Sequence, residues 1–185
     1  METLDFKKAF SYPFNRKIGL LNIFWMLLPI FGWLALGGYS VRIMKGFINN
    51  KFDELPEFSF KSDMSLGFFM FLKSIPFFLG YGVIISLLIL ISDVFRYLAM
   101  FIEFFIIPIL FINFINKETI SSLFEFEIIK VVFEDISDYI ITMIKSIGLV
   151  LIYVVMCLIL IGFPAMVFTP NIFIADFYKR KVLNK

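Results

Sequence analysis

The sequence predicts an all-α integral membrane protein with four transmembrane helices, built as two same-orientation repeats of span, amphipathic connector and span. Of its 185 residues, 61% are hydrophobic, against roughly 45–50% in globular proteins. Several apolar runs reach the roughly 20 residues that a spanning helix needs. One phrase also occurs twice, as FINNKFDELPEF at 47–58 and as FINKETISSLFEF at 114–126. A soluble core of this size cannot bury so much apolar surface, so the excess must face lipid or a partner.

The first predicted span is Ile18–Tyr39, an apolar run interrupted only by Asn22. Pro29 lies near its middle, where proline is tolerated if neighbouring helices satisfy the freed carbonyl. A re-entrant hairpin that turns at Pro29–Gly32 is the alternative for the same residues.

Three further segments are long and apolar enough to span. They are Ser65–Ile91, Tyr97–Ile115 and Ile140–Phe168. The last is longer than a bilayer requires, so we expect it to tilt or to extend beyond the hydrocarbon.

The stretches between the spans are predicted to be amphipathic. In the second stretch, apolar residues recur in steps of three and four, with charged residues in the same rhythm on the opposite side, as in a half-exposed helix. The apolar stripe is Phe126, Ile129, Phe133, Ile136 and Ile140; the charged one is Glu127, Lys130, Glu134 and Asp138. The first stretch, Phe52–Met64, contains Pro56, which favours a turn that enters a short helix.

The repeated phrase suggests an internal repeat within a single membrane domain, residues 1–185. A second echo follows each copy, because Lys73-Ser74-Ile75 and Lys145-Ser146-Ile147 open the second and fourth spans. The units would cover about 17–91 and about 94–168; the alternative is a chance echo in a chain rich in Phe, Ile, Asn and Lys. Two-span units return the chain to its starting side, so we expect a pseudo-two-fold axis along the membrane normal and both connectors on one face.

Orientation follows from Lys and Arg near the span ends. The basic ends, 1–17 and 169–185, together with Arg96 in the middle loop, carry nine such residues, and the opposite face carries six. Both termini are therefore predicted to be cytoplasmic, with the connectors on the other side.

Two segments carry a family resemblance. Gly38-Tyr39-Ser40-Val41-Arg42, followed by Leu55-Pro56-Glu57-Phe58 and another apolar helix, resembles an uncharacterised family of archaeal and bacterial integral membrane proteins, the domain of unknown function DUF4013. The resemblance covers most of the chain, but only GY-x-x-R and LPEF are specific. It implies a multi-pass protein of a prokaryotic cell membrane and brings neither catalytic residues nor a substrate.

Composition limits the chemistry. The chain has no histidine, which removes the commonest metal ligand and neutral-pH acid–base group. Its single cysteine, Cys157, lies in an apolar run and belongs to no thiol metal site. The net charge of +2 gives no nucleic-acid footprint. We therefore expect no cofactor, no metal, no nucleic acid and no catalytic residue.

The candidate site residues are ionisable groups in or beside the spans, where charge is costly and often functional. Glu103 is a candidate proton or cation site, a partner for a lysine, or an interfacial carboxylate. Lys73 and Lys145 are lipid- or anion-binding candidates, although each could also snorkel to the interface. Glu57 and Glu125, equivalent in the two copies, are their expected protein partners, and Arg42 joins the lysines or anchors the end of the first span.

These residues suggest a non-catalytic membrane protein, an interaction or accessory component that binds a partner protein, a peptide or lipid, as an immunity-like protein or a complex subunit does. Besides the lipid bilayer, we expect a protein partner or a homo-oligomer. The alternative is a small oligomeric carrier or channel with its path at the repeat interface, which the few polar residues in the spans argue against.

Overall fold

The computed structural model describes residues 3–184, and all regular secondary structure in this part of the chain is helical. The α-helices are α1 (Phe6–Ser11), α2 (Lys17–Leu20), α3 (Phe31–Ile48), α4 (Phe60–Ile91), α5 (Val94–Phe101), α6 (Ile107–Lys117), α7 (Ile129–Glu134), α8 (Ile136–Met156), α9 (Gly162–Phe168) and α10 (Ile172–Tyr178). Short 3₁₀ and π segments join several of them, among them η2 (Leu21–Leu27), η3 (Ile102–Ile106), η4 (Ile120–Phe124) and η5 (Phe126–Ile128).

Three helices are long and apolar enough to cross a membrane, which indicates a membrane protein. They are Phe60–Ile91, Val94–Lys117 and Ile136–Ile159. The first two confirm the helices predicted at Ser65–Ile91 and Tyr97–Ile115, and the third covers most of the fourth prediction. The first predicted span differs.

Residues Ile18–Tyr39 form a helical hairpin and not one continuous helix. The chain descends through α2 and η2, turns at Leu28–Ile30, and returns as α3. Ile30 takes a positive φ of 65° at the turn. Gly32 is required here, because a Cβ on it would lie 1.8 Å from the carbonyl oxygen of Trp25. The backbone at Pro29 therefore follows the hairpin alternative. Pro29 ends the first half of the hairpin, and Gly32 allows α3 to approach η2 closely.

The fourth predicted segment, Ile140–Phe168, also turns back. Leu160 has a positive φ of 62° and breaks the helix after Ile159. A Cβ on Gly162 would lie 2.0 Å from the carbonyl oxygen of Tyr153, so glycine allows α9 to fold against α8. The extra length that suggested tilting belongs to a return limb.

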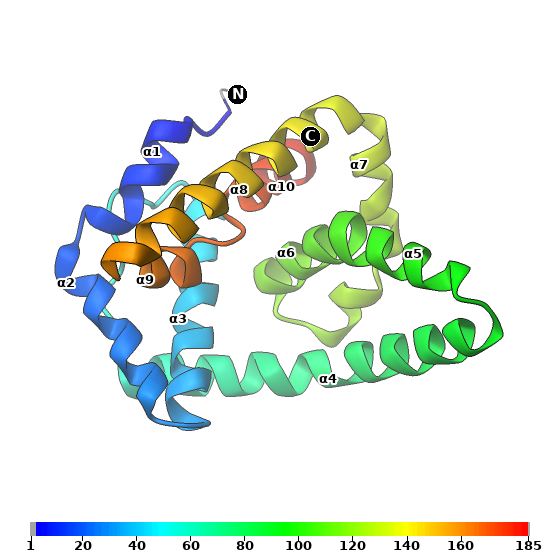
Figure 1. Cartoon of the computed structure of the whole chain (residues 1–185), viewed down its shortest axis with the longest axis horizontal. Helices are drawn as coiled ribbons and strands as arrows, with labels where there is room; N and C mark the ends of the chain where they lie inside the picture. Colours follow the sequence, from blue (N-terminus) through cyan, green and yellow to red (C-terminus); the bar gives the residue numbers. More distant parts are fainter. Residues whose placement is uncertain (1–2, 185) are drawn as a thin grey trace.

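Helix α10 completes that limb and lies in the core between α3, α6 and α8 (Figure 1). All seven of its residues are buried. Residues 169–185 were expected to be a basic tail, but the described part of this segment supplies a central packing element. An apolar core forms around it from Tyr39, Ile43, Phe114 and Tyr139.

Helices α3 and α4 cross at a contact between two glycines. A Cβ on Gly38 would lie 1.9 Å from the carbonyl oxygen of Asp63, and a Cβ on Gly67 would lie 1.9 Å from that of Leu34. Beyond the crossing, α4 continues as a long arm and meets α5 at the opposite end of the molecule (Figure 1). The close crossing fixes the direction of this arm.

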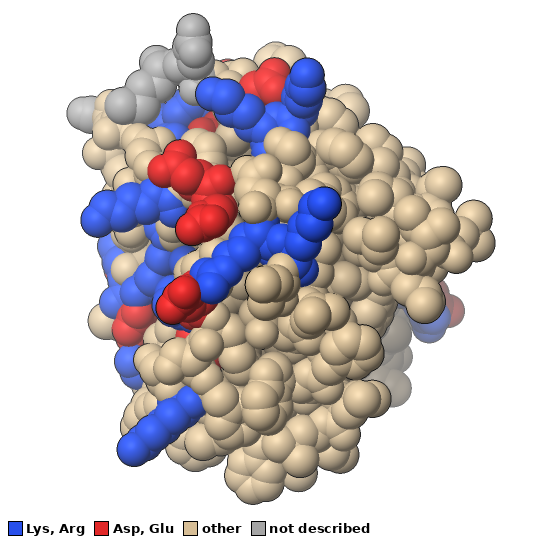
Figure 2. Space-filling view, turned by 90° about the vertical axis from the view of Figure 1, so that its left-hand side faces the viewer, with Lys and Arg blue, Asp and Glu red and all other residues tan. Residues whose placement is uncertain are grey.

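Both termini lie on the same side as both connectors. Asn15 Nδ2 donates to the carbonyl of Asp53 at 2.8 Å, and Lys179 Nζ donates to Asn50 Oδ1 at 2.9 Å. Lys181 pairs with Asp135 beside the second connector. Figure 2 shows the charged side chains gathered over one part of the surface, next to a broad uncharged one. The prediction that the connectors face away from the termini is therefore wrong. Arg96, counted with the termini, lies instead at the far end of the α4 arm (Figure 1).

The connectors also differ from prediction in detail. The first has no regular structure until α4 begins at Phe60, which fits the predicted turn at Pro56. The second is broken into η4, η5 and α7. Its predicted apolar stripe is largely turned outward, since Phe133 is 56% exposed, whereas Val132 is 1% exposed and packs inward. The spacing of apolar residues in steps of three and four indicated an amphipathic segment. It did not show which of the apolar residues are buried inside the protein.

Candidate functional site

The GY-x-x-R and LPEF segments meet in space at one junction. Tyr39 and Arg42 lie one turn apart on α3 and both reach the connector: the Tyr39 hydroxyl donates to the carbonyl of Pro56 at 3.0 Å, and the Arg42 guanidinium donates to that of Glu57. Leu55 is fully buried beneath them. The two motifs act together to hold the connector against α3.

Asp63 anchors the junction to α4. Its carboxylate is fully buried, pairs with Arg42 at 2.9 Å, and accepts the backbone N–H of Ser59 at 2.8 Å. Arg42 Nε and Asp63 Oδ1 have no hydrogen-bond partner among the described residues. Arg42, a lipid- or anion-binding candidate from the sequence, is thus committed to an internal ion pair. Nothing in the local sequence marked Asp63 as its partner, because the pair depends on the glycine crossing.

Glu57 and Glu125 have partners other than those expected. Glu57 pairs with Arg16 at 2.9 Å. Glu125 accepts hydrogen bonds from Lys117 and from Asn113 Nδ2, and these bonds hold the pKa of its carboxyl below the ordinary value. The predicted pairing of these acids with Lys73 and Lys145 is therefore not observed.

The two candidate lysines have different surroundings. Lys73 donates to the carbonyl oxygen of Glu118 at 2.8 Å, and Lys45 pairs with the carboxylate of the same residue. Lys145 lies 5.9 Å from the ring centre of Phe173 and lines a pocket formed by residues 3–6. Only Lys73 lies in a cluster of charged side chains.

Glu103 is in the π segment η3, where it accepts a hydrogen bond from the Tyr81 hydroxyl at 3.2 Å. The π segment ends two residues before Pro108, which has no N–H to continue a regular ladder. Short π segments occur often at functional sites. The sequence identified Glu103 as a candidate, and the structure adds Tyr81.

An ionic network at the chain ends was not predicted. Asp176 on α10 accepts from Lys179 at 3.0 Å, from Arg180 Nε at 2.9 Å and from the backbone N–H of Leu4 at 3.1 Å. Arg180 also pairs with Asp138 at the start of α8. The only signal in the sequence was the basic cluster 179–181, which by itself is typical of a solvated tail.

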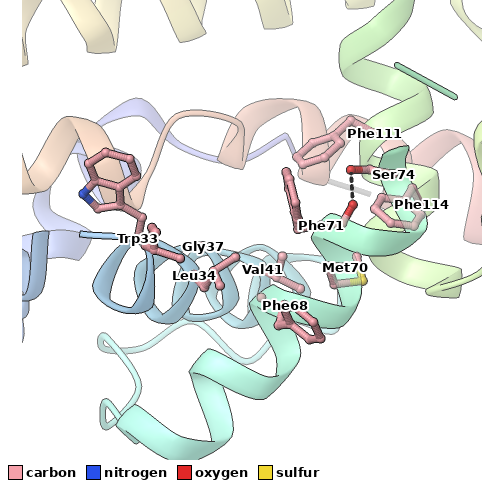
Figure 3. A pocket seen from close by; sticks show the side chains of 12 residues that line it. Trp33, Leu34, Gly37, Val41, Phe68, Met70, Phe71, Ser74, Phe111 and Phe114 are labelled. Atoms are coloured by element: carbon pink, nitrogen blue, oxygen red, sulfur yellow. Dashed lines mark hydrogen bonds between the residues drawn. The ribbon is translucent and has the colours of Figure 1, made fainter. Parts of the chain in front are cut away.

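An apolar groove of about 570 Å³ lies between α3, α4 and α6. Trp33 stands at one end and Phe111 and Phe114 at the other, with Gly37 and Phe71 between them (Figure 3). Its polar side chains are already engaged: the Trp33 indole donates to the carbonyl of Met26 and the Ser74 hydroxyl to that of Phe71. A ligand here meets a mainly apolar surface.

These features define an all-helical membrane protein with an apolar groove among its helices. On one side it has a polar layer, formed by the chain ends and the two connectors with their hydrogen bonds and ion pairs. Among residues 3–184, no group of three His, Cys, Asp or Glu is placed to hold a metal ion. Comparisons with protein-family models, characterised proteins and solved structures gave no match.

Proposed function

We propose that the protein is a non-catalytic integral membrane component that binds an apolar helix of a partner subunit in the groove between α3, α4 and α6. The observation that carries this proposal is the groove itself, whose polar side chains are satisfied internally. A substrate that must be oriented for chemistry needs placed polar groups. A membrane helix needs close packing and small residues in the contact, and Gly37 in the groove wall offers such a surface.

A photo-reactive residue at Gly37 tests the proposal. A Cβ at this position would meet nothing within 4 Å, so we expect a larger side chain to be accepted here. Gly80, equally open but outside this groove, is the matched control. Irradiation of native membranes should give one discrete protein adduct at Gly37 and none at Gly80. A product of twice the 21.6 kDa chain mass identifies a second copy as the partner. Lipid adducts alone at both positions would overturn the proposal.

A carrier or channel is the second candidate, and one observation favours it: the hydrogen bond between Tyr81 on α4 and Glu103 on η3. An intramembrane acid with a hydroxyl partner is typical of proton and cation pathways. The adjoining pocket, about 430 Å³, is lined mainly by apolar side chains, which supports the interaction role more strongly. Ion flux in proteoliposomes that Glu103→Gln abolishes would favour transport instead.

The fold also supports the proposed family and orientation. Membership of the DUF4013 family is supported by the junction between GY-x-x-R and LPEF, because the specific residues of both motifs hold the first connector against α3. A cytoplasmic location of both termini is supported by charge, because Arg96 alone among the described Lys and Arg residues lies at the far end of the arm. The internal repeat is supported by Phe47-Ile48 and Phe114-Ile115, which are buried pairs in the last turns of α3 and α6.

A further inference from the structure

A second pocket, of about 640 Å³, lies along a face of α4 that the apolar groove does not use. Lys61 and Lys73 line it together with the serines at 59, 62 and 65 and with Glu118. Steps of four along a helix bring Lys61, Ser65, Phe69 and Lys73 onto one face. The pocket therefore has an ammonium group toward each end and hydroxyl groups between them.

The charge of this pocket is unbalanced. Lys61 has no hydrogen bond or ion pair to another described residue, whereas Lys73 and Lys45 share the single residue Glu118. Lys45 lies outside the pocket, but its ion pair uses the carboxylate of Glu118. The pocket lysines, Lys45 and Glu118 together therefore carry a formal charge of +2. Asp63, the nearest acid on α4, is buried against Arg42 and cannot compensate. An anion would complete the cluster.

The surroundings show what kind of anion fits. Leu66 and Phe69 line the same pocket, and Phe69 is 55% exposed. Next along α4, Leu72 is 43% exposed, and the arm beyond Lys73 is apolar. A ligand with a charged head and an apolar chain matches this sequence of surfaces, whereas a fully hydrated anion leaves the apolar part uncovered.

We infer that this pocket binds the phosphate of an anionic phospholipid, with the headgroup between Lys61 and Lys73 and an acyl chain along α4 beyond Leu72. Basic pockets at the edge of membrane helices recognise anionic headgroups. The serine hydroxyls donate to the phosphate oxygens, and the two ammonium groups attract its negative charge. The site shares no lining residue with the apolar groove and does not depend on a protein partner.

The test is lipid binding to the full chain in detergent, followed by native mass spectrometry. Phosphatidylglycerol, phosphatidylcholine and inorganic phosphate are the probes. Wild type should bind phosphatidylglycerol in preference to phosphatidylcholine. The double variant Lys61→Gln/Lys73→Gln should lose roughly 30-fold in that preference, the combined effect of two lysines at a membrane surface.

The matched control removes two positive charges outside the pocket. Lys51→Gln/Lys130→Gln changes the net charge equally and should shift the preference by less than about threefold, because non-specific attraction is screened. If the double variant does not fold because the Lys73 hydrogen bond is lost, the single variant Lys61→Gln is used in its place. The variant Lys61→Arg/Lys73→Arg keeps both positive charges and should retain binding.

The outcomes are distinct. Competition of phosphatidylglycerol by inorganic phosphate would show that the pocket binds free phosphate and would overturn the assignment to a lipid, whereas resistance to competition supports it. An equal loss in the pocket and control variants, or no preference in wild type, overturns the inference. Neither result bears on cross-linking at Gly37, so this site and the proposed function can fail separately.

Discussion

Replacement of Gly67 by alanine should destabilise the fold, whereas the same change at Gly80 should not. Both glycines lie inside α4, where alanine normally gains about 1 kcal/mol over glycine. At Gly67 the new Cβ would lie 1.9 Å from the carbonyl oxygen of Leu34, while ordinary contact begins at 3.4 Å. The helices must separate by the difference, 3.4 − 1.9 = 1.5 Å. At Gly80 there is nothing within 4 Å.

That separation also affects the ion pair beside the crossing. Arg42 and Asp63 lie 2.9 Å apart, and Asp63 is fully buried, so a displacement of this size breaks the pair. Overpacking costs about 1–3 kcal/mol, and a broken buried pair about 3–5 kcal/mol. We therefore expect Gly67→Ala to lose about 3 kcal/mol or more, whereas Gly80→Ala gains up to about 1 kcal/mol.

Thermal unfolding in detergent measures the difference through tryptophan emission. Trp25 reports on the right place, because its ring lies 4.5 Å from that of Phe60 at the start of α4. A loss of about 3 kcal/mol lowers the Tm by roughly 6–12 °C for a chain of this size. Gly38→Ala should behave like Gly67→Ala, and Gly37→Ala like Gly80→Ala, because a Cβ at Gly37 would meet nothing within 4 Å. Equal Tm values for Gly67→Ala and Gly80→Ala would refute the close crossing.

Three further predictions follow from the fold. In a Cys157→Ala background, cysteines at Lys61 and Lys130 should react with an impermeant thiol reagent only from the side that also exposes the termini, and a cysteine at Arg96 only from the other side; labelling of Lys61 and Lys130 from opposite sides would contradict the single polar layer. Val132→Asp should abolish folded protein, since Val132 is 1% exposed, whereas Phe133→Ser, at 56% exposure, should be tolerated; equal yields would mean that α7 does not pack. The pKa of Glu125 is lowered in the folded state by Lys117 and Asn113, so its contribution to stability is present above the ordinary value of 4.5 and is lost as pH falls through the folded pKa. Glu125→Gln should remove that part of the acid sensitivity, and an unchanged acid unfolding profile would show that the pair contributes nothing.

The sequence was sufficient for features that depend on local composition. Long apolar runs located α4, the α5–α6 helix and α8, because a helix that satisfies its own backbone is the stable form of such a run in lipid. Pro29 marked the break in the first segment, and the Gly162-Phe163-Pro164 run was a comparable signal in the last. Length alone concealed that second break, since an apolar segment of 29 residues reads equally well as one long helix or as a hairpin.

Contacts between distant segments could not be predicted in the same way. The prediction that the termini and the connectors lie on opposite faces assumed four uninterrupted spans. The structure turns back within Ile18–Tyr39 and within Ile140–Phe168, so that assumption fails. Asp63 and Asp176 are acids whose significance depends on Arg42 and Arg180, which reach them only after the helices pack. Lys73 was a candidate because it is an ionisable group in an apolar run, but its partner is the carbonyl oxygen of Glu118 and not Glu57.

The buried network around α10 explains how a chain so rich in interchangeable apolar surfaces selects one packing. Asp176 and Lys179 are each less than 10% exposed, and they connect α10 to the backbone of Leu4 and to Asn50. Buried ion pairs of this kind are weak contributors to net stability, because desolvation offsets most of the attraction. These ion pairs instead destabilise alternative packings of α10. A shift of α10 by one turn along α8 would retain apolar contact but leave Asp176 or Lys179 buried without a partner. Such an unpaired charge costs several kcal/mol, so the network excludes shifted packings that apolar contacts alone would allow.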